Sequence, residues 1–128
     1  MKKSRPQPKC LYKAFLKRDG KLISPYKRRQ AWSATKKALT EKNAKKGWTS
    51  KRVKGRIEMC WNGYHAGTLK GWFGVDSFER FRKDYPDQVL FRVELNEVPS
   101  LNSADYWHGQ GDGGKWVGRS FTIIKRVV

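Results

Sequence analysis

The chain has 128 residues, a formal net charge of +18 and a hydrophobic content of 38%. Its length predicts one domain with a single core, and its six Trp, five Tyr and six Phe argue against a disordered chain, because large rings bury much apolar area. The sequence has no apolar run of membrane-spanning length and no signal-peptide pattern, so we expect a cytoplasmic protein with no membrane partner.

The positive charge is confined to the first half of the sequence. Residues 1–56 hold 20 Lys and Arg against two acidic residues, which gives 20 − 2 = +18, whereas residues 57–128 carry no net charge. Charges that only keep a protein soluble are normally of mixed sign and spread over the chain. The asymmetry therefore predicts a polyanionic partner, which the field attracts and which releases its counterions on contact.

The first residues predict an arm followed by a β-hairpin. Residues 1–9 contain two prolines and four basic residues and no pattern that buries apolar area, so we expect a flexible basic arm before a single domain over residues 10–128. Residues 10–16 predict a strand, and the Asp-Gly pair at 19–20 predicts a tight turn into a short return strand at 22–23.

The next stretch predicts a basic helix and then a buried strand. Residues 27–46 are rich in Ala, Lys, Gln, Arg and Leu, and Gly47 follows them, which is typical of a helix that ends there. Its apolar stripe is thin, so the helix would lie on the surface with a broad cationic face. A strand is expected at 53–60, followed by an Asn-Gly turn that presents Tyr64 and His65.

A capping-box pattern at residues 76–79 predicts a short helix that ends before Pro86, with Phe78 and Phe81 on its buried side. Residues 89–95 alternate as a half-buried strand does. The remaining segments are a long loop over residues 99–114 and a closing segment over residues 115–128, whose core at residues 121–124 predicts another strand. The order of elements predicts an α+β domain, mostly antiparallel sheet with one basic helix and one short helix.

The cationic half supplies the residues that we expect to contact phosphates of DNA or RNA, and nearby aromatic rings would stack on unpaired bases. Tyr12 and Trp32 fall on apolar faces and favour the core, whereas Trp48 falls in a turn and is expected to be more open. The predicted nucleic-acid-binding residues are Arg28, Arg29, Lys36, Lys37, Lys45, Lys46, Trp48, Lys51, Arg52 and Lys54.

The residues do not predict a metal site or a cofactor. Cys10 and Cys60 are the two cysteines, and their spacing with His65 and His108 matches no zinc module, so two free thiols are expected. Each histidine titrates near neutrality and lies beside aromatic residues. A general acid or base and a packed, hydrogen-bonded imidazole therefore both remain open.

Three stretches, at residues 11–15, 59–66 and 89–95, resemble a family of small bacteriophage proteins with a Tyr-Lys-Ala/Gly-Phe opening and a Cys-x-x-Gly-Phe/Tyr-His-Ala centre. They are also distantly similar to the ADP-ribosyltransferase-like fold. That second resemblance implies that Lys13 and His65 line one pocket as catalytic residues, with NAD as the cofactor. In this chain Lys13 stands where a transferase has Arg or His, and no Gln/Glu-x-Glu pair marks a catalytic strand.

Three functional hypotheses follow. The first is a phage-type protein that binds nucleic acid through its cationic half in the host cytoplasm. The second is an ADP-ribosyltransferase-like enzyme that acts on a nucleic acid or nucleoprotein. The third is an inhibitor of a host nucleic-acid machine. Salt-sensitive binding to bare nucleic acid favours the first, NAD-dependent labelling the second, and tight binding to a host protein alone the third.

Overall fold

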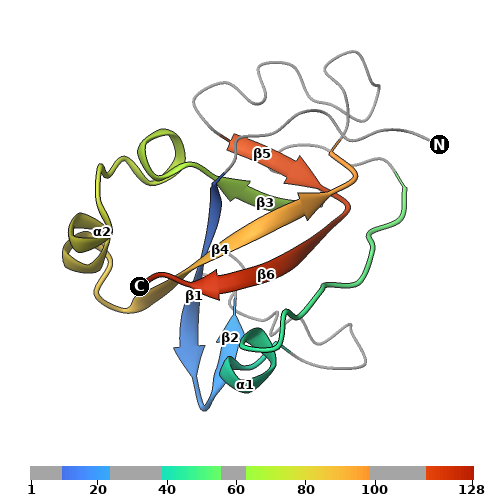
Figure 1. Ribbon diagram of the computed structural model, residues 1–128, viewed down its shortest axis with the longest axis horizontal. Helices are drawn as coiled ribbons and strands as arrows, with labels where there is room; N and C mark the ends of the chain where they lie inside the picture. The colour runs from blue at the N-terminus through green and yellow to red at the C-terminus, as the bar shows by residue number, and fades with distance from the viewer. Residues whose placement is uncertain (1–9, 24–38, 56–62, 99–114) are drawn as a thin grey trace.

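The computed structural model describes residues 10–23, 39–55, 63–98 and 115–128 (Figure 1). Within these ranges one six-stranded sheet has the order β5-β3-β1-β4-β6, with β2 paired to β1, and every pairing is antiparallel. The elements are β1 (Leu11–Arg18), β2 (Lys21–Ile23), α1 (Glu41–Ala44), β3 (Tyr64–Gly67), the π-helical turn η1 (Leu69–Phe73), α2 (Phe78–Asp84), β4 (Gln88–Asn96), β5 (Lys115–Gly118) and β6 (Ser120–Arg126). The predicted mostly antiparallel sheet is confirmed.

Strand β1 lies at the centre of the sheet. One of its edges pairs with β4, and the other pairs with β3 near the start of the strand and with β2 near its end. The turn between β1 and β2 has positive φ at both Asp19 (51°) and Gly20 (77°). A turn with that geometry matches the twist of a two-residue hairpin, as the Asp-Gly pair predicts.

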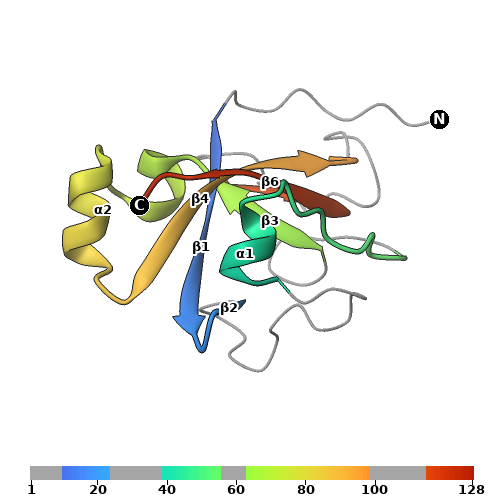
Figure 2. The ribbon, with the colours of Figure 1, turned by 60° about the horizontal axis from the view of Figure 1, so that its bottom comes forward.

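The sheet curls into a half-barrel because the strands at its two ends are consecutive in the chain (Figures 1 and 2). Only Arg119 separates β5 from β6. At this corner a Cβ on Gly118 would lie 2.9 Å from the Asn96 carbonyl oxygen and 3.1 Å from Leu95 Cβ, so glycine allows the close approach. The Arg119 amide donates to the Asn96 carbonyl at 3.0 Å, which holds the corner against β4.

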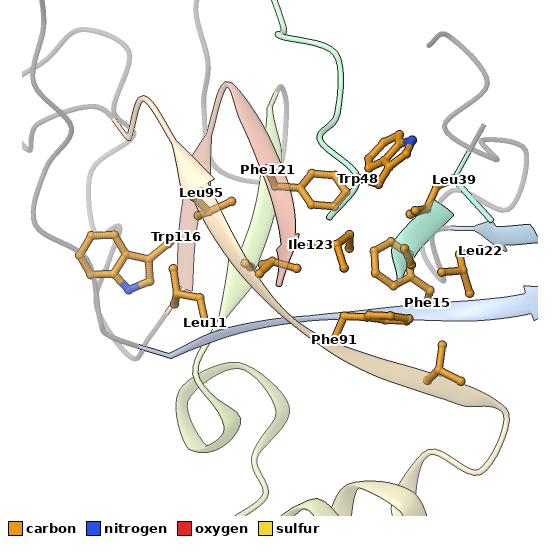
Figure 3. Close-up of a cluster of buried hydrophobic side chains, with 14 of the residues drawn as sticks. Leu11, Phe15, Leu22, Leu39, Trp48, Phe91, Leu95, Trp116, Phe121 and Ile123 are labelled. Carbon is orange, nitrogen blue, oxygen red and sulfur yellow. The ribbon is translucent and has the colours of Figure 1, made fainter. Parts of the chain in front are cut away.

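The inner face of the half-barrel holds the main core (Figure 3). Phe15 of β1 stacks on Phe121 of β6 with 6.2 Å between ring centroids and meets Phe91 of β4 edge-on at 5.7 Å. Leu39 and Trp48 enter the same core from outside the sheet. The buried residues of the main core are Leu11, Phe15, Leu22, Leu39, Ala44, Trp48, Ala66, Val89, Phe91, Val93, Leu95, Val98, Trp116, Phe121 and Ile123.

A second, smaller core lies on the outer face, where η1 and α2 pack over β1 and β4. Phe73 of η1 meets Phe81 of α2 edge-on at 5.4 Å, and Phe81 stacks on Tyr85 at 4.9 Å. Ser77 caps α2 by accepting a hydrogen bond from the Arg80 amide at 3.1 Å, so the predicted short helix is confirmed. Phe78 departs from the prediction, because its side chain is 37% exposed.

The helix predicted over residues 27–46 is interrupted near its end. Thr40 is extended (φ −124°, ψ 165°) and pairs with Lys21, so among the described residues of this stretch, 39–46, only the single turn α1 is helical. Residues 39–40 instead pair with β2 of the hairpin, where the Leu22 amide donates to the Leu39 carbonyl at 3.0 Å. Backbone pairing thus outweighs helix propensity here. Residues 24–38 lie outside the described ranges.

The strand predicted over residues 53–60 is wrong at its start, because residues 53–55 form no strand and Gly55 has a φ of 80°. Residues 56–62, including Cys60, lie outside the described ranges, as do the predicted arm and the loop over residues 99–114. The strand found here is β3, which begins just after the predicted turn. The closing segment over residues 115–128, expected to hold one strand, divides into two, β5 and β6.

Candidate nucleic-acid interface

Residues 48–54, here called the edge segment, lie along the outer edge of β6. The Ile123 amide donates to the Trp48 carbonyl at 2.8 Å, the Ser50 amide to the Phe121 carbonyl at 2.9 Å, and the Val53 amide to the Arg119 carbonyl at 2.8 Å. Figure 1 shows the segment leaving α1 and running beside β6. An edge strand exposes unpaired backbone groups, and these bonds satisfy them.

Buried side chains fix the edge segment in place. Ser50 is 7% exposed, and its hydroxyl oxygen accepts a hydrogen bond from the Phe121 amide at 2.9 Å. The Trp48 ring lies 5.6 Å from the ring of Phe121 and is 8% exposed. The expectation of an open Trp48 that stacks on bases is therefore wrong. The sequence placed it in a turn, but its ring closes one end of the main core.

The outward side chains of this region are cationic. Lys51, Arg52 and Lys54 of the edge segment are exposed, and so are Lys45 and Lys46 just before it. No carboxylate of the described residues forms an ion pair with any of these four lysines. The backbone is hydrogen-bonded to β6, so the charges of these four lysines face solvent with no carboxylate partner among the described residues.

Arg52 differs from these lysines because it is paired. Its Nε donates to Glu97 Oε2 at 2.6 Å and its Nη2 to Glu97 Oε1 at 2.8 Å. The hydrogen bonds from Arg52 hold the pKa of Glu97 below its ordinary value and raise the pKa of Arg52. This two-pronged pair ties the edge segment to the end of β4, although two exposed partners add little stability.

Arg119, which the sequence did not single out, fastens the far end of the edge segment. Its guanidinium donates to the Val53 carbonyl at 3.1 Å and to the Gly55 carbonyl. The contact joins residues more than 60 positions apart, and no local motif marks it. Four other predicted contacts, Arg28, Arg29, Lys36 and Lys37, lie outside the described ranges.

Lys13, one of the two predicted catalytic residues, points into the main core. It alternates with Leu11 and Phe15 on the inner face of β1. Its ammonium donates to the His65 carbonyl at 2.7 Å and lies 5.3 Å from the centroid of the Phe121 ring. Burial lowers the pKa of Lys13 to about 7, because the charged form loses its hydration.

His65, the second predicted catalytic residue, meets Lys13 only through its backbone carbonyl. Its neighbours Tyr64 and Ala66 pack in the main core, so the alternation of β3 places the imidazole on the outer face. There its ring lies 6.3 Å from the ring of Trp72. The side chains of Lys13 and His65 thus lie on opposite faces of the sheet and do not line one pocket.

In the described part of the chain, no three His, Cys, Asp or Glu side chains gather as they would around a metal ion. Cys10 is a free thiol there. The helices of that part are too short or too polar to cross a membrane.

No model of a protein family, no curated protein and no solved structure matches the chain. The resemblance to a bacteriophage family and to the ADP-ribosyltransferase-like fold therefore remains a hypothesis from the sequence.

Proposed function

We propose that this protein binds nucleic acid, and that the cationic edge of the half-barrel contacts the phosphates. The observation that carries the proposal is the edge segment, in which exposed lysines with no carboxylate partner in the described part of the chain project from a backbone anchored along β6. A row of fixed positive charges binds a polyanion by releasing its counterions.

The sequence supports the same surface. Residues 41–54 hold six Lys and Arg against Glu41 alone, within a half of the chain that carries all of its net charge. Contacts of this kind position a protein on nucleic acid without reading its sequence. Binding is thus expected to be strong at low salt and to depend little on base order. Such a protein would act in the cytoplasm, in a host cell if it is phage-encoded.

The enzyme hypothesis loses its proposed pocket, because the ammonium of Lys13 and the imidazole of His65 lie on opposite faces. The inhibitor hypothesis would use the same cationic edge against an acidic protein surface. Binding to bare nucleic acid separates the nucleic-acid-binding proposal from the inhibitor hypothesis. An inhibitor that binds an acidic surface of a host protein needs no affinity for nucleic acid itself.

The test compares two triple charge reversals by fluorescence anisotropy with labelled oligonucleotides across a salt series. The edge variant changes Lys46, Lys51 and Lys54 to Glu. The control changes Lys70, Arg82 and Lys83, three exposed cations of η1 and α2, which lie away from the edge segment (Figure 2). Both variants lower the net charge by the same amount.

We expect the edge variant to lose most of its affinity and to lower the slope of log K on log salt by about one unit for each lysine that contacts a phosphate. The control should lose much less. Equal losses in the two variants would show that net charge alone matters and would refute a dedicated edge.

A further inference from the structure

A row of aromatic and basic side chains crosses the outer face of the sheet. Tyr12 of β1 is paired in register with Arg92 of β4, and Arg92 is paired with Lys125 of β6. Residues directly opposite on neighbouring antiparallel strands point to the same face, with Cβ atoms about 5 Å apart. A register shift between Arg92 and Val93 leaves one extra residue in β6, so Lys125 shares the face of Arg92 although Ile123 packs in the main core. Phe78 completes the row, because its ring meets the ring of Tyr12 edge-on at 5.6 Å.

Phe78 is the unusual member of this row. It is the first residue of α2, yet its side chain is 37% exposed, while Phe81 one turn later is fully buried. The second core is therefore complete without the outer part of the Phe78 ring. Tyr12 packs at the border of that core and is partly exposed. Two rings thus present apolar edges and faces to solvent beside two cations.

The electrostatics of the row suit a base with its phosphate. Burial, and after it the neighbouring Cys10, raise the pKa of Tyr12, while Arg92 acts on it in the opposite direction. The Tyr12 hydroxyl therefore stays neutral and able to hydrogen-bond. Glu94, on the same face of β4, is exposed and would repel a phosphate. A phosphate would therefore lie on the side of Arg92 and Lys125.

We propose that the row Tyr12, Phe78, Arg92 and Lys125 holds an unpaired base against the two rings and its phosphate against the two cations, so that the polymer is single-stranded. This inference rests on the proposed function and extends it to a substrate class. Bases within a duplex cannot reach such a platform, whereas every unpaired base has a face that stacks on an aromatic ring.

The row continues toward the cationic edge. Lys125 lies on β6, the strand whose other edge carries residues 48–54, and Thr49 pairs with Thr122 three positions from Lys125. Glu94 is paired with Thr122, so a strand of nucleic acid that leaves the rings would pass Lys125 and reach the edge segment at its Trp48 end, where the Ile123 amide bonds the Trp48 carbonyl, away from that carboxylate. One continuous path would join stacking at one end to phosphate contacts at the other.

The experiment measures affinity for three labelled ligands of equal length: oligothymidine, an abasic oligonucleotide with the same phosphates, and a duplex. The variants are Phe78→Ala, Phe78→Leu and Arg92→Gln. Ile124→Ala is the matched control, because Ile124 is the other large hydrophobic side chain exposed in the described ranges, at 45%. Circular dichroism melting confirms that each variant is folded.

We expect the wild type to bind oligothymidine more tightly than either other ligand. Phe78→Ala and Phe78→Leu should weaken oligothymidine binding about tenfold and leave abasic binding unchanged, as the loss of one stacked base does. Arg92→Gln should weaken both single strands, and Ile124→Ala neither.

Equal wild-type affinity for oligothymidine and abasic ligand would overturn the stacking site while leaving phosphate binding intact. A loss in Phe78→Ala that is the same for both ligands would overturn it too, because the ring would then act through the fold. If the wild type binds none of the three ligands, the proposed function itself fails.

Discussion

Lysines occupy two opposite environments in the half-barrel, one enclosed on its inner face and one exposed on its outer edge. On its inner face, Lys13 is enclosed between the Phe121 ring and a backbone carbonyl, and burial lowers its pKa to about 7. On its outer edge, Lys51 and Lys54 project into solvent from a hydrogen-bonded backbone. The comparison shows that the cationic half of the sequence is not one surface: what a lysine does depends on which side of a strand it occupies.

Trp48 connects the two regions, because it belongs to the edge segment and its ring packs in the main core. Trp48→Ala removes a ring that is 8% exposed and packs on Phe121, so we expect it to lower the free energy of unfolding by about 3–5 kcal/mol. Urea denaturation measures the loss. It should also loosen the edge segment and weaken nucleic-acid binding in parallel.

Lys51→Ala is the control for that change, since an exposed side chain of the same segment should alter stability by less than about 0.5 kcal/mol. A Trp48→Ala variant with unchanged stability and lost binding would return Trp48 to the open, base-stacking role that the sequence suggested.

The inner lysine should make stability depend on pH. The pKa of Lys13 falls from an ordinary 10.5 to about 7 on folding, so between these values the unfolded chain binds more protons. Stability should therefore rise with pH in this window, by about 2 kcal/mol from pH 7 to pH 9. Lys13→Met should abolish this rise and be more stable than the wild type at pH 7, because losing the bond to the His65 carbonyl costs only about 1 kcal/mol.

Lys17→Met is the matched control, because Lys17 lies on the same strand but is exposed and paired with Glu41 at 3.2 Å. Urea unfolding at pH 7, 8 and 9 should give it the pH dependence of the wild type. The upper limit of pH 9 keeps the tyrosines out of the measurement, since burial raises the pKa of Tyr64 above its ordinary 10.0. A Lys13→Met variant that keeps the full rise would show that another group causes it.

The two lysine environments also show how far the sequence could predict this molecule. The hairpin, α2 and β4 were predictable, because a turn of positive φ, a helix cap and an alternating strand are all local patterns. The course of residues 39–55 was not, because its bonds run to the first hairpin and to β6, partners far away in sequence.

The candidate site follows the same division. The exposed lysines were predictable from composition and charge. The burial of Trp48 and the opposite faces of Lys13 and His65 were not, because each depends on the pairing of β1, β3 and β6. The exposure of Phe78 was not predictable either. The capping pattern predicts where α2 begins, but the packing of the second core decides that Phe81 is buried and Phe78 is not.

The smallest expected effect concerns the one described cation of the edge segment that has an acidic partner. Arg52 and Glu97 are 56% and 45% exposed in their side chains, so breaking their pair should change the unfolding transition by little more than the error of the measurement. The effect should lie in binding instead. Glu97→Gln removes a negative charge beside the proposed phosphate path and frees Arg52, so it should raise nucleic-acid affinity by about threefold at low salt.

Arg52→Gln in turn should weaken binding less than Lys51→Gln, its matched neighbour, because Arg52 must leave Glu97 before it can contact a phosphate. Anisotropy titrations of the three variants at two salt concentrations decide the order. If Arg52→Gln proves the most damaging of them, the pair with Glu97 orients Arg52 toward the phosphate rather than neutralising it. The outer edge would then contain one preorganised contact among otherwise interchangeable lysines, and its binding would resemble a specific site more than a charged surface.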